Sequence, residues 1–261
     1  MLLLPPIPEV FRALTVDGAR ISGMGVDFRD YDNDGRPDIA ITGLARQNYA
    51  LYRNEGNGTF TYRSLASGLA ALSGGHSGWG MRFEDFDNDG WNDYFAAQGH
   101  VMDNVDQIDP SLHALEIPLL ALARGGRFEL AGSGMTTPVA GRGAAFGDLD
   151  NDGSIDVVMT VLGGRPVIFH NRKSDRHWLT ITLRGTRSSR DGLGAKVRVN
   201  GQSQVATAGG SYLSSSDRRV HFGLGSATTA DVEILWPSGT RQRLPGVRAD
   251  RFLSVTEPEK P

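Results

Sequence analysis

Aspartates recur in this chain at a spacing that suits a hard metal ion. The pattern Asp-x-Asp-x-Asp-Gly-x-x-Asp occurs three times, and each copy places four carboxylates within nine residues. Such closely spaced negative charges repel one another unless a cation lies among them. Ca²⁺ accepts about six to eight oxygen ligands in a flexible geometry, and the glycine permits the sharp turn that wraps the loop round an ion. The sequence therefore predicts up to three bound Ca²⁺ ions.

Each loop would supply oxygens from four aspartate side chains and one backbone carbonyl. The predicted ligands are Asp30, Asp32, Asp34, Arg36 and Asp38 in the first loop, Asp85, Asp87, Asp89, Trp91 and Asp93 in the second, and Asp148, Asp150, Asp152, Ser154 and Asp156 in the third. A single copy could be an ordinary polar turn, but three matching copies favour metal binding. The loops are not EF-hands, because the twelfth positions hold Ile41, Ala96 and Met159 where an EF-hand needs a glutamate.

Short strands must position these loops. A glycine-rich strand is expected before each loop, at residues 23–28, 78–83 and 141–146, and an apolar strand after it, at residues 39–42, 94–97 and 157–160. Later apolar runs would complete units of four short strands. The motifs begin 55 and 63 residues apart, and four strands per repeat are typical of β-propeller blades.

The last third of the chain has a different pattern. Alternating apolar residues begin at Trp178 and recur at residues 195–199, 219–222, 231–236 and 252–255, with glycine-containing turns between them. The predicted fold class is therefore all-β, with three blades of an incomplete propeller followed by a small β-sandwich-like domain. The predicted divisions are a lead-in at 1–20, three repeats at 21–76, 77–139 and 140–172, and the terminal domain at 173–258.

These blocks resemble known families. The repeats are similar to FG-GAP (or VCBS) repeats, and Phe146-Gly147-Asp148 contains the dipeptide that names them. Residues 190–197, 210–215, 221–225 and 235–239 resemble the ASPIC/UnbV domain. The combination is similar to the C-terminal region of the cartilage acidic protein family and its bacterial relatives. The resemblance implies Ca²⁺ bound by all twelve aspartates of the loops, in a secreted protein with integrin α-like blades.

Three blades are fewer than a closed propeller contains, since these close with about four to eight. We therefore expect this chain to be the C-terminal part of a longer protein, whose secretion signal would precede Met1. Two alternatives are self-association through the open blade edges to complete a ring, and an incomplete fan capped by the terminal domain.

Composition limits the cellular locations and the kinds of partner expected for this protein. The chain has no cysteine and a net charge of −3, and no apolar stretch long enough to span a membrane. Residues 1–171 carry a net charge of −10 and residues 172–261 a net charge of +7. The basic C-terminal part could contact acidic polymers such as anionic glycans or nucleic acid. Ordinary surface arginines, together with attraction between the two parts of the chain, are the favoured explanation. An extracellular or periplasmic location is expected, with an unidentified protein or glycan ligand.

Catalytic signals are weak. No thiol nucleophile, Gly-x-Ser-x-Gly or His-Glu-x-x-His motif is present. His76 beside Ser77 and the rim residue His100 are the nearest candidates for acid–base chemistry, and both fit structural roles better. Trp178 and Trp236 are expected in the core, whereas Trp91 could be partly exposed. The sequence therefore predicts a calcium-binding adhesion or interaction protein without catalytic residues; the alternative is a carbohydrate- or phosphoester-active enzyme built on a propeller.

Overall fold

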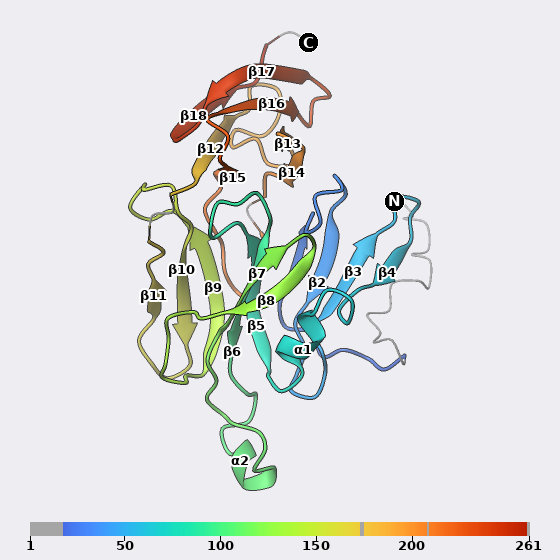
Figure 1. Cartoon of the computed structure of the whole chain (residues 1–261), viewed down its shortest axis with the longest axis vertical. Helices are drawn as coiled ribbons and strands as arrows, with labels where there is room; N and C mark the ends of the chain where they lie inside the picture. Colours follow the sequence, from blue (N-terminus) through green and yellow to red (C-terminus); the bar gives the residue numbers. More distant parts are fainter. Residues whose placement is uncertain (1–17, 173–174, 208, 260–261) are drawn as a thin grey trace, which may run out of the picture.

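Strands are the predominant regular structure of this protein and the two helices are short, which confirms the predicted all-β class. The computed structural model describes residues 18–172, 175–207 and 209–259, so most of the predicted lead-in lies outside the described residues. Figure 1 shows three blade-like sheets side by side, with a further pair of sheets at the end of the molecule that carries the C-terminus. Neither helix found among the described residues has the length and apolar character needed to span a membrane.

The first two repeats each form a four-stranded antiparallel sheet in chain order. Blade 1 consists of β1 (Val26–Arg29), β2 (Asp38–Ile41), β3 (Ala50–Asn54) and β4 (Phe60–Tyr62). Blade 2 consists of β5 (Gly78–Glu84), β6 (Asp93–Gln98), β7 (Leu119–Arg124) and β8 (Arg127–Ala131). The short helix α1 (Leu69–Ser73) connects the two blades, and α2 (Val105–Ile108) projects from the connection between β6 and β7 (Figure 1).

The third repeat corrects the prediction of four strands per unit. Its sheet contains three strands in the described part of the chain, β9 (Gly141–Gly147), β10 (Asp156–Val161) and β11 (Val167–Phe169). The chain leaves β11 and reaches the terminal domain within eight residues, at His177. Among the described residues, β11 is therefore the outermost strand of blade 3.

Aromatic side chains fill the seam between blades 1 and 2. Phe83 of β5 is fully buried there. Its ring centroid lies 6.3 Å from that of Tyr31, 5.5 Å from that of Tyr94 and 6.0 Å from that of Phe128. Because Phe128 comes from the fourth strand β8, the outermost strand of blade 2 helps to seal this seam.

A second apolar cluster joins blades 2 and 3. Phe146 of β9 occupies the position of Phe83, since Phe83 pairs with Tyr94 and Phe146 pairs with Val157 in the same register. The Phe95 ring lies 5.7 Å from the Phe146 ring at a steep angle. Blade 2 thus lies between the other two blades.

The glycines at the start of each first strand let the backbones of neighbouring blades meet. A Cβ atom on Gly25 would lie 1.9 Å from the carbonyl oxygen of Trp79, and one on Gly80 would lie 2.4 Å from the amide nitrogen of Ala144. Any side chain here would force the innermost strands apart. The Gly-x-Gly pattern seen in the sequence is therefore a packing requirement.

The terminal domain is a β-sandwich, as predicted. One sheet orders its strands β15-β12-β18 and the other β14-β13-β16-β17. The strands are β12 (His177–Arg184), β13 (Lys196–Val199), β14 (Gln202–Val205), β15 (Val220–Gly225), β16 (Thr229–Leu235), β17 (Arg241–Arg248) and β18 (Arg251–Thr256). Both sheets contribute to one apolar core, which includes the fully buried Trp236. Sequence reasoning missed β14 and β17, because polar residues fill them.

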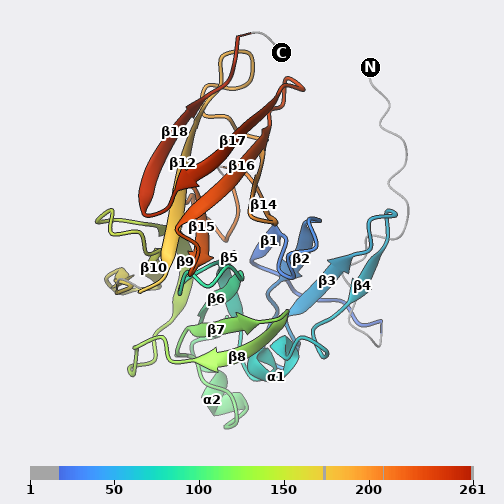
Figure 2. The ribbon, with the colours of Figure 1, turned by 45° about the horizontal axis from the view of Figure 1, so that its top comes forward.

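The chain between β14 and β15 extends from the sandwich to the innermost strands of the blades (Figure 2). The Ser211 amide donates to the Val26 carbonyl at 3.3 Å, and its hydroxyl donates to the Ala144 carbonyl at 2.7 Å. The Asp217 amide donates to the Phe146 carbonyl at 2.9 Å. Residues 211–217 therefore tie blades 1 and 3 to the terminal domain.

Glu257 is expected to make the terminal domain sensitive to acid. Burial opposes ionisation, but hydrogen bonds from the Ser238 hydroxyl and from the amides of Ser188, Arg187 and Thr186 lower the pKa of Glu257 to about 2. The folded pKa lies below the unfolded value of 4.5. The ionised Glu257 side chain therefore stabilises the folded state. This stabilisation is complete above about pH 5 and declines as the pH falls towards 2.

Thermal unfolding of the full chain measured from pH 6 to pH 2 checks this expectation. Glu257→Gln should have a lower Tm than the parent at pH 6 and a smaller loss of Tm between pH 5 and pH 2. Parallel pH profiles for the two proteins would contradict the assignment.

Candidate metal centre

All three aspartate loops join the first strand of a blade to its second strand, at the same end of the blades. The asparagine at the fourth position of each loop has a left-handed backbone, with φ of 59° at Asn33, 59° at Asn88 and 60° at Asn151. The glycine two residues later is also left-handed, with φ between 84° and 92° in the three loops. Since asparagine and glycine tolerate this region best, sequence and turn geometry agree in every copy.

The first aspartate of each loop holds the turn together. Asp30 accepts hydrogen bonds from the amides of Asp34 at 3.1 Å and Gly35 at 2.7 Å. Asp85 and Asp148 accept the corresponding pair in the second and third loops, at 2.7–3.1 Å. The turn is therefore built round a buried carboxylate.

The last aspartate of each loop connects the loop to the third strand. Asp38 accepts from the amides of Tyr31 at 3.1 Å and Asn54 at 2.7 Å. Asp93 and Asp156 make the equivalent pairs at 2.7–2.9 Å. The loops are consequently fixed at both ends before any ion is considered.

This architecture brings together most of the predicted carboxylate ligands. Carboxylate oxygens lie within 4.8 Å of one another in three sets: Asp30, Asp32 and Asp38; Asp85, Asp87 and Asp93; and Asp148, Asp150 and Asp152. A fourth set, Asp150, Asp156 and His170, overlaps the third loop. The fifth-position aspartates Asp34 and Asp89 lie outside these sets and accept from the amides of Arg36 and Trp91 at 2.9 Å. Ligation by the Arg36, Trp91 and Ser154 carbonyls stays a prediction.

Burial makes these carboxylates poor anions without a cation. Burial raises the pKa of Asp30 to about 6, that of Asp38 to about 7 and that of Asp93 to about 8. In the third loop, the Ser154 hydroxyl oxygen is buried without a hydrogen-bond partner. These sites contain several carboxylate oxygens, and the third also has a hydroxyl oxygen without a hydrogen-bond partner. Such oxygen ligands suit a hard divalent cation.

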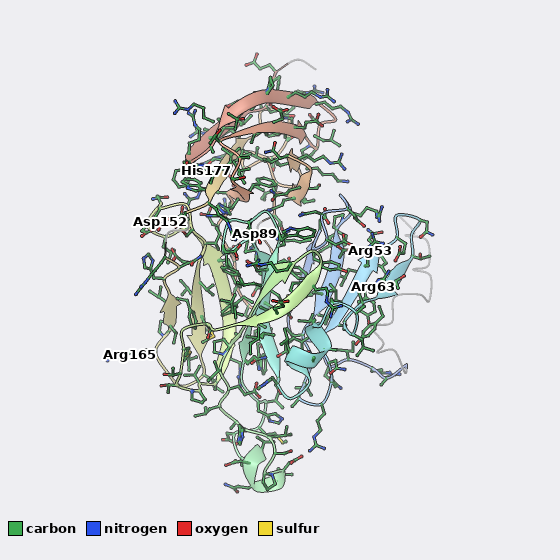
Figure 3. The ribbon with its side chains drawn as sticks, in the orientation of Figure 1. Arg53, Arg63, Asp89, Asp152, Arg165 and His177 are labelled. Atoms are coloured by element: carbon green, nitrogen blue, oxygen red, sulfur yellow. The ribbon has the colours of Figure 1, made fainter. Side chains whose placement is uncertain are left out.

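Arginines that sequence reasoning missed contact two of the loops. Arg53 of β3 pairs with Asp32 at 2.6 Å and with Asp34 at 2.7 Å. Figure 3 labels Arg53 on blade 1. Arg124 of β7 pairs with Asp87 at 2.7 Å and with Asp89 at 2.6 Å. Each arginine lies next to a residue whose amide donates to the last aspartate of the loop, Asn54 beside Arg53 and Ala123 beside Arg124.

The third loop has a histidine in place of this arginine. His170 Nδ1 lies 3.2 Å from Asp156 and Nε2 lies 3.7 Å from Asp150. His170 and Arg53 hold the same position, because each precedes the residue whose amide bonds the last aspartate. The third loop therefore differs chemically from the other two.

Successive loops are bonded to one another through their asparagines. The Asn33 amide group donates to the Gly90 carbonyl at 2.8 Å, and the Asn88 amide group donates to the Gly153 carbonyl at 3.0 Å. At the third loop, Arg219 of the terminal domain donates to the Asn151 side chain at 2.7 Å. The asparagine shared by all three motifs is visible in the sequence. Its hydrogen bond to the next loop or domain is visible only in the folded structure.

The terminal domain rests on this loop end of the blades. The Gly225 amide donates to the Asn88 carbonyl at 2.9 Å, and His221 Nε2 lies 2.7 Å from the Asn88 side-chain oxygen. Arg176 pairs with Asp87 at 2.8 Å. Figure 3 shows Asp89 and Asp152 at the end of the blades that faces the sandwich. The predicted attraction between the acidic and basic parts of the chain is therefore present at this interface.

The interface is closely packed. His221 is buried between Thr180 and Asn88, and its burial, followed by the nearby Arg219 and Arg29 charges, lowers its pKa to about 4. The cavity beside it has a volume of about 20 Å³, enough for one water. The interface therefore presents a neutral histidine to the second loop at physiological pH.

Two comparisons with known proteins agree with this architecture. Residues 30–96, which include the first two loops, match the model of the FG-GAP-like repeat. Residues 185–261 match the model of the ASPIC and UnbV domain. The chain is an FG-GAP repeat protein with a terminal ASPIC/UnbV domain.

Curated relatives extend over both parts of this FG-GAP repeat protein. Human cartilage acidic protein 1 is 25% identical over 243 residues, which cover 86% of this chain and 34% of that protein. Cartilage acidic protein 1 of Xenopus tropicalis is 24% identical over 249 residues, covering 88% of this chain and 36% of that protein. The chain thus spans about a third of the length of the relatives it matches.

The candidate acid–base residues of the FG-GAP repeats each have a different partner. His76 Nδ1 lies 3.4 Å from Glu116, whereas the hydroxyl of Ser77 accepts a hydrogen bond from the Ala45 amide. His100 is buried and its Nδ1 accepts from the Met102 amide at 3.1 Å. These contacts are consistent with the structural roles predicted for His76 and His100.

The structure confirms the predicted place of one buried tryptophan and corrects that of another. Trp236 belongs to the core of the terminal domain, as predicted. Trp178 is buried outside that core, between Gly153 of the third loop and the His221 ring. Trp91 is partly exposed and packs against the core between blades 1 and 2. Trp79 donates to the Gly99 carbonyl and stacks under the Arg142 guanidinium at 4.2 Å. The Trp79 ring therefore packs between neighbouring blades.

Proposed function

We propose that the three loops each bind one Ca²⁺ ion and that the ions hold the loop end of the FG-GAP blades in the form that carries the ASPIC/UnbV domain. The observation that supports this most directly is the repetition of one geometry. The same left-handed residues and the same carboxylate hydrogen bonds occur in all three loops. A cation would neutralise carboxylates whose burial now disfavours their charge.

The resulting protein is a non-catalytic interaction module of an extracellular or periplasmic compartment. Calcium sites of extracellular modules have dissociation constants of about 10⁻⁴–10⁻³ M, which matches the calcium available outside cells. The relatives named cartilage acidic protein 1 favour the same compartment. The partner would be a protein or a glycan that binds the rigid blade surface, and nucleic acid would not bind this acidic region.

Calorimetric titration of the full chain with CaCl₂ tests calcium binding. We expect three ions per chain, because the three loops share one geometry. Asp32→Asn, Asp87→Asn and Asp150→Asn should each reduce the stoichiometry from three to two. Calcium at ten times Kd should stabilise the fold by about 1.4 kcal/mol per site, and EDTA should reverse this.

Asp109→Asn is the matched control for this titration. Asp109 pairs with Arg46 far from the loops, so the stoichiometry of this variant should stay at three. A flat titration of the folded protein, together with a Tm unchanged by CaCl₂ and EDTA, would refute calcium binding.

A further inference from the structure

His170 is the one histidine of the described residues with two carboxylates within ion-pair distance. Its Nδ1 atom lies 3.2 Å from Asp156, and its Nε2 atom lies 3.7 Å from Asp150. The other histidines with a carboxylate neighbour, His76 and His177, have one each. An ordinary ion pair between one histidine and one aspartate therefore does not describe the surroundings of His170.

A neutral imidazole ring cannot satisfy a carboxylate at each of its nitrogens. The neutral ring donates a proton from one nitrogen, and the other nitrogen carries a lone pair. At His170 this lone pair faces a negatively charged oxygen, and the two repel each other. A cation bound to this nitrogen and to the neighbouring carboxylates turns the repulsion into attraction.

The first two loops compensate the same charges with an arginine, which cannot bind a metal. Arg53 and Arg124 each pair with the third-position and fifth-position aspartates of their loop. A guanidinium has no lone pair available to a metal ion. In the described part of the chain, no arginine or lysine pairs with the corresponding Asp150 or Asp152 of the third loop. The third loop therefore combines uncompensated carboxylates with a side chain that is a good metal ligand.

The three side chains already lie close to a metal-binding arrangement. One oxygen each from Asp150 and Asp156 and one ring nitrogen of His170 all lie within 4.8 Å of one another. Ligand atoms of a tetrahedral Zn²⁺ ion lie about 3.4 Å apart, because its bonds to nitrogen and oxygen are about 2.0–2.2 Å long. The separations of 3.2 and 3.7 Å from the two ring nitrogens lie on either side of this value. Small side-chain rotations would thus suffice to bind one ion.

Burial gives this cluster a fixed inner side and an open outer side. The Asp156 side chain is 1% exposed, whereas those of Asp150 and His170 are 50% and 57% exposed. The Asp156 carboxylate is also fixed, because it accepts from the amides of Leu149 and Asn171. An ion could therefore enter from solvent and reach a ligand that is already in place.

The position of His170 does not depend on what lies beyond β11. Arg53 of blade 1 holds the same position, since each of these residues precedes the one whose amide bonds the last aspartate. In blade 1 the strand β4 pairs with β3 at Arg53, and Arg53 still contacts its loop. A strand placed beside β11 would therefore leave His170 at the third loop.

We propose that Asp150, Asp156 and His170 bind one Zn²⁺ ion in the third loop, with water at the fourth position. Zn²⁺ accepts both imidazole nitrogen and carboxylate oxygen, whereas Ca²⁺ takes oxygen ligands. Asp150 and Asp156 are also predicted calcium ligands, so zinc and calcium compete for this loop. The competition rests on the calcium binding proposed above, whereas the zinc site does not.

Calorimetric titration of the full chain with ZnCl₂ tests this proposal. The parent protein should bind one Zn²⁺ ion per chain. His170→Gln should weaken this binding by more than the about 10–100-fold lost when an outer-shell partner of a metal ligand is removed. With zinc bound, a CaCl₂ titration should give two calcium ions in the parent protein and three in the variant. In protein labelled with ¹⁵N-histidine, zinc should shift a ring-nitrogen resonance that the variant lacks.

His177→Gln is the matched control, because His177 also contacts an aspartate, Asp250 at 2.6 Å, but has one carboxylate neighbour. It should bind zinc as the parent protein does. His170→Gln should bind calcium normally in the absence of zinc, which shows that this variant is folded. Unchanged zinc binding in His170→Gln, or an equal loss in His177→Gln, would overturn the site. A flat calcium titration with intact zinc binding would refute the calcium proposal alone.

Arg53→His tests whether the position itself creates a zinc site. In the first loop, Asp32 and Asp38 occupy the motif positions of the two proposed aspartate ligands and lie in one carboxylate set. The variant places a histidine beside them, so the zinc stoichiometry should rise from one to two. A stoichiometry that stays at one would show that a histidine at this position does not recruit zinc, and would overturn the inference drawn from it.

Discussion

Replacing Phe83 by alanine is expected to lower the free energy of unfolding of the FG-GAP region by about 3–5 kcal/mol. Phe83 is fully buried and is surrounded by the rings of Tyr31, Tyr94 and Phe128. Its removal would leave a cavity between two rigid sheets, which cannot collapse without moving a blade. Urea unfolding of the full chain in CaCl₂, followed by circular dichroism, would measure this loss.

Phe28→Ala is the matched control, since Phe28 occupies the same register but is half exposed. This variant should cost less than about 1 kcal/mol. Equal losses at Phe83 and Phe28 would show that burial in the seam does not determine the stability of the blades.

Replacing Gly223 by alanine is expected to separate the ASPIC/UnbV domain from the second loop. A Cβ atom there would lie 2.0 Å from an Asp85 carboxylate oxygen and 2.5 Å from the Asn88 Cα atom. The backbone of the loop cannot move away, because Asn88 also bonds the third loop. The domain would therefore lose the Gly225 and His221 hydrogen bonds to Asn88, which contribute about 0.5–1.5 kcal/mol each.

Small-angle scattering and limited proteolysis would detect this separation. We expect a larger radius of gyration and faster cleavage between residues 170 and 176, while the far-ultraviolet spectrum stays that of the parent. Gly209→Ala is the control, because the nearest atom to its Cβ lies 3.9 Å away. An unchanged scattering curve for Gly223→Ala would show that the interface tolerates a shift of the loop.

The aspartate loops also connect the blades to one another and to the terminal domain. Their carboxylates would hold the proposed ion, while their asparagines and backbone carbonyls contact the next blade or the terminal domain. Any change in the turn geometry would alter both the ion site and these contacts. Calcium binding at the loops and docking of the ASPIC/UnbV domain should therefore favour each other.

Local features of this protein followed from the sequence. The spacing of Asp30, Asp85 and Asp148 in their motifs predicted three equivalent turns, and the apolar runs beside them predicted most of the strands. These predictions succeed because a turn and a strand depend mainly on residues close to one another in the chain. The Gly-x-Gly starts of the blades were visible in the same way, although their purpose was not.

Only the tertiary structure decided what surrounds the loops. Arg53 and Arg124 reach the aspartates from other strands, His221 meets Asn88 across 133 residues, and the described part of blade 3 has three strands. The exposure of Phe28 against the burial of Phe83 cannot be read from two similar motifs, because it depends on whether another blade lies alongside. The sequence by itself determined the repeated turns, through steric and charge effects within a few residues. The contacts between repeats and domains were decided by packing between distant segments, which no local pattern encodes.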